Sequence, residues 1–163
     1  MECAVIGAGV SGLTCALRLL ENGHIVTIYS NKFSPNTVSD VAAAIWYPFL
    51  SYPIKKTNKW SLETYSELFK ISLNSPESGV TIRKGREFLR DKISPPDWTK
   101  GIDGFRILEN NELVNDYIFG WEFEAPVIQM NLYMPWINDK LIKMGCRFNE
   151  VDVEYFSEIE ENI

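Results

Sequence analysis

Histidine and cysteine are scarce in this sequence of 163 residues, and each scarcity excludes a class of protein. His24 is the only histidine, so no two-histidine metal site can form. Its surroundings predict a turn, which disfavours hydrolase chemistry of the Ser-His-Asp type. Cys3, Cys15 and Cys146 are scattered, odd in number and without CxxC spacing. We therefore expect buried thiols in a reducing compartment, and neither a disulfide framework nor a metal site.

Membrane segments and basic clusters are missing as well. The longest apolar run, residues 41–50, is about half as long as a membrane helix and contains Pro48. Glu2 follows the initiator and no apolar signal core comes after it, so we expect no secretory signal. The formal net charge of −6 without a Lys/Arg cluster argues against nucleic acid as a partner. We expect a soluble cytoplasmic protein, with a peroxisomal location left open, that binds neither nucleic acid nor membranes.

The first thirty residues are the most informative part of the chain. Residues 3–6 are an apolar run typical of a buried parallel strand, and Gly7-Ala8-Gly9-Val10-Ser11-Gly12 follows at once. Apolar residues then repeat at helical spacing from 13 to 20, and residues 25–29 are a second, β-branched strand. In this context GxGxxG predicts a dinucleotide-binding turn, with Gly7 for the tight turn, Gly9 for the approach of a pyrophosphate and Gly12 for close helix packing. The N–H groups at the helix start and its dipole would hold the anion.

One part of this pattern is missing. The acidic residue expected about 20 residues further on, which binds the ribose hydroxyls, has no counterpart in Ser30-Asn31-Lys32 at the end of the second strand. Asn31 could accept a hydrogen bond from a hydroxyl group, and Lys32 could face a phosphate. An NADP site with Lys32 on the 2′-phosphate therefore stays open, as does a plain strand–helix–strand turn without a ligand.

A second unusual segment reads Ser39-Asp40-Val41-Ala42-Ala43-Ala44-Ile45-Trp46-Tyr47-Pro48. Four small apolar residues are followed there by large ones. From composition this stretch favours a buried strand or core loop. The alternative is a flat plate against which a planar ring lies.

With these segments the sequence resembles the D-amino-acid oxidase and D-aspartate oxidase family. The matching stretches are residues 5–12, 39–46, 104–106 and 133–137, in the family's order and at similar separations. The most selective of them is the Asp-Val-Ala-Ala segment with its following tryptophan, which lies against the flavin ring of FAD in that family. Trp46 fits the D-amino-acid oxidase branch better than the aspartate branch. The resemblance covers essentially this whole chain, but only the N-terminal half of a family member.

The resemblance implies FAD as the cofactor and assigns its contacts residue by residue. The glycine turn would line the pyrophosphate, Lys32 matches a basic residue near the adenosine end, and Asn31 stands where the family usually has an acid. Ser39 matches a hydroxyl residue near the phosphates or ribityl chain, and Val153 one whose backbone meets the adenine. The predicted FAD-binding residues are Gly7, Ala8, Gly9, Val10, Ser11, Gly12, Asn31, Lys32, Ser39, Asp40, Ala43, Ala44, Ile45, Trp46 and Val153. No catalytic residue and no metal ligand is predicted.

The remaining chain predicts further strands and helices without an internal repeat. We expect a helix capped by Asn58 through residue 71, and short paired strands at 80–82 and 87–89 around Gly85. Further strands are expected at 105–108, 117–123, 127–130 and 146–153, with a helix at 133–144 and a frayed helix or turn at the acidic end, residues 158–163. The predicted class is α/β: an incomplete Rossmann-like FAD-binding βαβ domain of residues 1–50 and 132–163, with an inserted antiparallel α+β substrate domain at 51–131.

The function implied by the resemblance is FAD-dependent oxidation of a D-amino acid by O2 to a 2-oxo acid, with release of ammonia and hydrogen peroxide. The family's substrate clamp and active-site tyrosines lie in the half that this sequence does not contain, so the isolated chain could be inactive. Two alternatives stay open: a glycine or amine oxidase of the same superfamily, and a non-catalytic FAD-binding fragment completed by a complementary C-terminal chain. A homodimer is left open as well.

Overall fold

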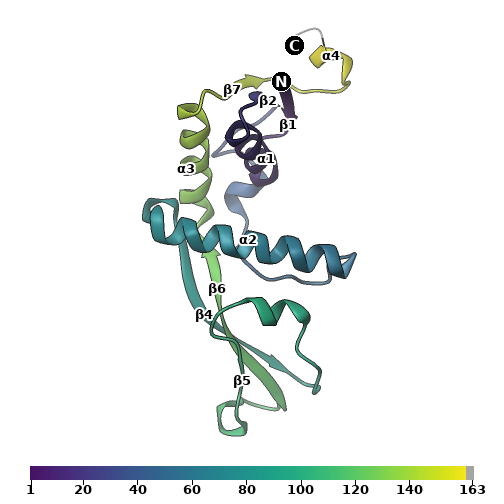
Figure 1. The fold of residues 1–163 in the computed structure, drawn as a ribbon, viewed down its shortest axis with the longest axis vertical. Coiled ribbons are helices and arrows are strands. Elements are labelled where there is room, and N and C mark those ends of the chain that lie inside the picture. The colour runs from purple at the N-terminus through teal and green to yellow at the C-terminus, as the bar shows by residue number, and fades with distance from the viewer. Residues whose placement is uncertain (161–163) are drawn as a thin grey trace. The chain divides into compact units, whose positions relative to one another are not determined.

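The computed structural model describes residues 1–160, which divide into two compact units (Figure 1). The first unit comprises residues 1–43, 77–79 and the described residues from Gln129 on, and the second unit comprises 44–76 and 80–128. This division describes compact units, and the domain limits expected from the sequence (1–50, 51–131 and 132–163) remain a prediction. Short 3-10 segments are η1 (Val38–Val41), η2 (Pro76–Ser78), η3 (Asp97–Gly101) and η4 (Asn110–Glu112).

The first unit is built on a parallel sheet of order β1-β2-β7. Its elements are β1 (Glu2–Ile6), α1 (Val10–Glu21), β2 (Ile25–Ser30), α3 (Met130–Lys143), β7 (Arg147–Glu150) and α4 (Ser157–Glu160). In the register Val5 lies opposite Ile28, and Ile28 opposite Phe148. Helix α1 packs on β1, β2 and α3, so its buried stripe of Leu13, Ala16 and Leu17 closes the core. Burial of each large apolar side chain contributes about 1.5–3 kcal/mol.

The second unit is an antiparallel sheet of order β3-β6-β4, with β5 also paired to β6. Its elements are β3 (Ala44–Ile45), α2 (Ile54–Asn74), β4 (Val80–Leu89), β5 (Arg106–Ile107) and β6 (Phe119–Ile128). Helix α2 buries Tyr65 and Leu68. Aromatic side chains dominate the core, where Trp98 makes edge contacts with Trp46 and Phe123. The predicted antiparallel α+β character of this region is confirmed.

Several local predictions are wrong. The two short strands expected around Gly85 are one continuous strand, because β4 pairs with β6 from Val80 to Leu89. The strands expected at 117–123 and 127–130 are likewise the single strand β6, and Pro126 lies inside it. Helix α2 begins at Ile54 and not at Asn58, because the Lys56 and Thr57 N–H groups already donate to the carbonyl of the N-cap residue Pro53.

The prediction of three buried thiols is also wrong. Cys146 is buried, Cys3 is half-buried and Cys15 is exposed, because Cys15 lies on α1 away from Leu13 and Ala16. Burial raises the pKa of the Cys146 thiol to about 11. The sequence pattern alone does not separate these three environments.

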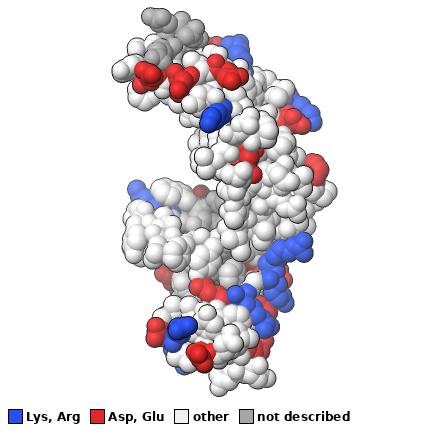
Figure 2. All heavy atoms as spheres, turned by 180° about the vertical axis from the view of Figure 1, so that it is seen from behind, with Lys and Arg blue, Asp and Glu red and all other residues white. Residues whose placement is uncertain are grey.

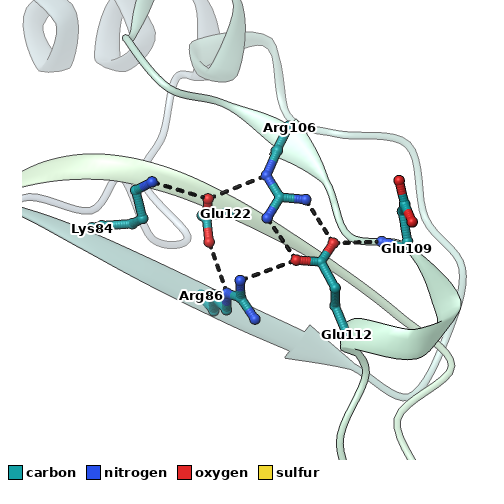
Figure 3. A network of polar contacts seen from close by, with 6 residues as sticks. All are labelled: Lys84, Arg86, Arg106, Glu109, Glu112 and Glu122. Atoms are coloured by element: carbon teal, nitrogen blue, oxygen red, sulfur yellow. Dashed lines mark hydrogen bonds and ion pairs between the residues drawn. The ribbon is translucent and has the colours of Figure 1, made fainter.

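A network of ion pairs joins β4, β5 and β6 in the second unit (Figure 3). The Glu122 carboxylate, 6% exposed, accepts hydrogen bonds from Arg86 Nε at 2.8 Å and Arg106 Nε at 3.2 Å, and Lys84 lies 3.4 Å away. Glu112 binds Arg106 at both oxygens, at 2.6 and 2.7 Å. The Arg106 bonds hold the pKa of Glu112 at about 2, and the Arg86 bond lowers the pKa of Glu122. Burial of the charged Glu122 carboxylate would be unfavourable without partners. Lys84, Arg86 and Arg106 compensate this cost.

Charge elsewhere is mixed in sign. On the face drawn in Figure 2, acidic side chains lie directly beside the largest group of basic ones, and most of the surface is uncharged. Among the described residues, no helix has the length and apolar character needed to cross a bilayer.

Candidate cofactor site

The glycine turn connects β1 to α1 at the carboxyl edge of the parallel sheet. Gly7 has φ +97°, a conformation that favours glycine, and its N–H donates to the Tyr29 carbonyl at 2.8 Å. A Cβ on Gly12 would lie 2.0 Å from the Gly7 carbonyl oxygen, so only glycine lets α1 begin this close to the turn. The sheet and helix thus determine the backbone of the loop before any ligand is considered.

Two serine hydroxyls from other segments, Ser30 and Ser39, accept hydrogen bonds from the backbone of this loop. Ala8 N–H donates to Ser30 Oγ at 3.3 Å, and Val10 N–H donates to Ser39 Oγ at 3.0 Å. Ser30 Oγ in turn donates to the Lys32 carbonyl at 2.8 Å, which ties the end of β2 to the loop. Two of the backbone donors are therefore already paired with hydroxyl groups.

The start of α1 suits an anion. The first intrahelical bond of the turn runs from Leu13 N–H to the Gly9 carbonyl at 3.0 Å, so the Ser11 and Gly12 N–H groups precede the regular ladder. No acidic residue lies in the first turn of α1. A Cβ on Gly9 would stand 3.1 Å from Ser39 Oγ, in the space between the turn and that hydroxyl. A pyrophosphate needs hydrogen-bond donors and room close to the backbone. The Ser11 and Gly12 N–H groups and the Ser39 hydroxyl are such donors, and the missing side chain of Gly9 leaves the room, so these residues fit FAD.

Residues 41–43 are exposed, which contradicts the buried strand or core loop that their composition favours. Val41 is 83% exposed at the end of η1, and Ala42 and Ala43 are also exposed. Asp40 holds this segment: its carboxylate accepts hydrogen bonds from Ser34 Oγ and from the Thr37 hydroxyl and N–H. Partial burial opposes ionisation of Asp40, but these hydrogen bonds outweigh it and lower its pKa. By binding Ser34 and Thr37, Asp40 fixes the backbone that leads directly into the exposed residues 41–43.

The last three residues of the predicted plate belong to the second unit. Ala44 and Ile45 form β3, which pairs with β6, and Ile45 is 58% exposed. Trp46 is buried, its indole N–H donates to the Ser61 carbonyl at 2.8 Å, and its ring contacts Tyr65 edge-on. The Trp46 side chain is thus part of the aromatic core of that unit.

A cavity of about 410 Å³ follows the same segment within the second unit. Its lining is largely apolar, with Ile45, Trp46, Pro48, Trp60 and Leu68 among its walls, and no lysine or arginine lines it among the described residues. Tyr47 also lines this cavity, and its hydroxyl donates to Glu87 Oε2 at 2.7 Å, which also accepts the Trp121 indole N–H. Burial, with the Glu87 hydrogen bond, raises the pKa of Tyr47. The described lining offers hydroxyl groups, those of Ser51, Thr57, Ser61 and Thr64, but no cation for a substrate carboxylate.

A smaller crevice of about 100 Å³ opens at the carboxyl ends of β1, β2 and β7. It brings together three predicted residues far apart in sequence: Gly7, Asn31 and Val153. Lys32 does not line it. Two residues that the sequence analysis missed are Ser30 and Asp152, and Asp152 Oδ1 accepts a hydrogen bond from Asn31 Nδ2 at 3.1 Å. Only the pairing of β7 with β2 could have indicated Asp152.

Comparison with known proteins identifies the family. The sequence model of the family described as FAD dependent oxidoreductase matches residues 2–158. The chain belongs to this family. The predictions of FAD and of an oxidoreductase are therefore confirmed at the level of the family, as is the predicted fold class.

Relatives of this chain include proteins named as amino-acid oxidases. The chain is 34% identical over 161 residues to a D-amino-acid oxidase of Rubrobacter xylanophilus, covering 98% of this chain and 48% of the relative. It is 34% identical to a Homo sapiens D-aspartate oxidase, covering 87% of this chain and 45% of that protein. The chain thus spans about half the length of the curated relatives it matches.

Solved structures share the fold at lower identity. L-proline dehydrogenase from P. horikoshii has a TM-score of 0.70 at 17% identity, covering 95% of this chain and 45% of that chain. L-amino acid deaminase from Proteus vulgaris has a TM-score of 0.68 at 16% identity, covering 90% and 38%. This likeness supports the fold of the chain and says nothing of its substrate.

Proposed function

We propose that this chain is the cofactor-holding part of an enzyme that oxidises D-amino acids. The overall reaction converts a D-amino acid, O2 and water into a 2-oxo acid, ammonia and hydrogen peroxide. The observation that carries the proposal is the geometry of the Gly7 to Gly12 turn, which fits the pyrophosphate of FAD. The relatives named D-amino-acid oxidase and D-aspartate oxidase support the substrate class.

FAD, when bound, supplies the acceptor for the hydride from the substrate Cα. The residues of this chain bind and orient it. The N–H groups at the start of α1 and the Ser39 hydroxyl would hold the pyrophosphate, and Val41, Ala42 and Ala43 offer a small, apolar, exposed surface for a planar ring. Such chemistry needs no side chain to take the transferred hydrogen.

The choice among D-amino acids is part of the proposal. A substrate carboxylate must meet a cation or several donors when it is buried. No lysine or arginine lines the 410 Å³ cavity among the described residues, so we assign it no cationic carboxylate clamp. Its walls of apolar and hydroxyl side chains suit the side chain of a neutral amino acid, and this favours D-alanine over D-aspartate.

The first experiment is an anaerobic visible spectrum of the protein with FAD, before and after D-alanine and then D-aspartate. We expect an oxidised-flavin spectrum, which D-alanine should bleach more readily than D-aspartate when the C-terminal half of the enzyme is present. A flavin spectrum that neither substrate changes in the presence of that half would contradict the activity but not the cofactor. A protein that is colourless after incubation with FAD and removal of the unbound FAD would contradict both.

A glycine variant tests the turn itself. Gly9→Val would place a branched side chain in the space next to Ser39, where the pyrophosphate is proposed to lie. We expect loss of FAD binding with an unchanged circular dichroism spectrum. Gly85→Ala is the control, because a Cβ there meets no atom within 4 Å. A Gly9→Val variant that keeps its full flavin complement would refute the assignment.

A further inference from the structure

The end of β2 lacks the acidic side chain that nucleotide-binding sheets use for ribose hydroxyls, and the structure places another carboxylate there. Strand β7 pairs in parallel with β2, with Ser30 opposite Glu150, and the Val151 N–H donates to the Ser30 carbonyl at 3.0 Å. The chain that leaves β7 therefore runs beside the chain that leaves β2. Asp152 consequently lies next to Asn31, although 121 positions separate them in sequence.

The two side chains form a matched pair. Asn31 Nδ2 donates to Asp152 Oδ1 at 3.1 Å, and both residues are exposed at the rim of the 100 Å³ crevice. A carboxylate has about four acceptor positions on two oxygens, so one bond from Asn31 leaves acceptor capacity directed to solvent. The Asn31 amide also has its own oxygen, which can accept a further hydrogen bond.

The crevice has the position of an adenosine site. Ligands of parallel α/β sheets bind outside the carboxyl ends of the strands, and this crevice lies at the ends of β1, β2 and β7. Gly7, the first residue of the glycine turn, lines the same crevice. A nucleotide whose pyrophosphate lies at the start of α1 would thus bring its ribose to the Asn31–Asp152 pair.

We propose that Asp152, positioned by Asn31, accepts the hydrogen bonds of the 2′- and 3′-hydroxyls of the FAD adenosine and so replaces the missing acid of β2. This inference rests on the proposed function, because it requires the nucleotide to bind at the glycine turn. It also indicates which cofactor the site rejects. A carboxylate repels a 2′-phosphate, so the NADP interpretation based on Lys32 is disfavoured.

The test measures how tightly the purified protein binds three probes: FAD, ADP and 2′-deoxy-ADP. Asp152→Asn keeps the size of the side chain and removes its charge. We expect it to weaken FAD binding about tenfold or more, as loss of a charge-assisted hydrogen bond does. We also expect the parent to prefer ADP over 2′-deoxy-ADP, and Asp152→Asn to lose most of that preference. A merely structural Asp152 would not change the discrimination between these two nucleotides.

Two further variants complete the design. The exchange Asn31→Asp with Asp152→Asn returns the acid to β2 and is expected to restore FAD affinity to near the parent value. Asp139→Asn, which removes one negative charge from the exposed face of α3, is the control for net charge and should bind FAD as the parent does.

The outcomes separate this proposal from the previous one. If the Asp152→Asn variant binds FAD with the affinity of the parent, or keeps the preference for ADP over 2′-deoxy-ADP, the role of Asp152 is refuted. The proposed cofactor site at the glycine turn is not affected by that result. A parent that binds neither FAD nor ADP overturns both proposals.

Discussion

Gly12 is the position where the structure predicts the largest effect of a single methyl group. In Gly12→Ala the new Cβ would lie 2.0 Å from the Gly7 carbonyl oxygen and 3.0 Å from its carbonyl carbon. Both atoms belong to the backbone, so no side chain can rotate away. The distance to the oxygen would have to widen to more than 3.0 Å, which moves the start of α1 away from β1.

The magnitude follows from two opposing effects. Overpacking of a well-packed site costs about 1–3 kcal/mol, and the better helix propensity of alanine returns up to about 1 kcal/mol. Because the new Cβ meets a backbone carbonyl group that cannot rotate away, we expect the upper part of this range and a net loss of about 2 kcal/mol. For a chain of this length this lowers the unfolding midpoint by about 4–8 °C.

The assay is thermal unfolding without FAD, followed by far-ultraviolet circular dichroism, so that the fold is measured apart from the ligand. Gly85→Ala is the matched control, since its Cβ would meet no atom within 4 Å and the residue has no left-handed conformation. It should unfold at or slightly above the parent midpoint. A Gly12→Ala midpoint equal to that of the parent would refute the close approach of α1 to the turn.

Two other predictions concern thiol chemistry and acid stability. Cys15 is exposed, whereas burial raises the pKa of Cys146 to about 11, so iodoacetamide should alkylate Cys15 first; mass spectrometry that finds equal rates would contradict the burial. The Arg106 bonds lower the pKa of Glu112 from its ordinary 4.5 to about 2, so the stability that this carboxylate contributes is complete above 4.5 and is lost as the pH falls through 2. Glu112→Gln should therefore make unfolding in denaturant less dependent on pH between these values, and an unchanged pH profile would show that the network of Figure 3 does not stabilise the fold.

Local sequence determined the turn and its flanking elements. A short apolar run, three glycines and a helical repeat of apolar residues predicted β1, the loop and α1, because each of these features acts within a few residues. The positive φ of Gly7 and the crowding at Gly12 are what such a loop requires of those positions. The family also followed from short motifs, and the match over residues 2–158 bears it out.

Tertiary structure decided what depends on pairing between distant segments. The sequence predicted two short strands on each side, but β4 and β6 pair continuously from Val80 to Leu89. The pairing between the two long strands outweighs the low strand preference of Gly85 and Pro126. Composition favoured burial for residues 41–43, yet they are exposed, since burial depends on what the rest of the chain places against them. Asp152 comes to the end of β2 through the parallel pairing of β7, a contact across 121 positions that no local pattern contains.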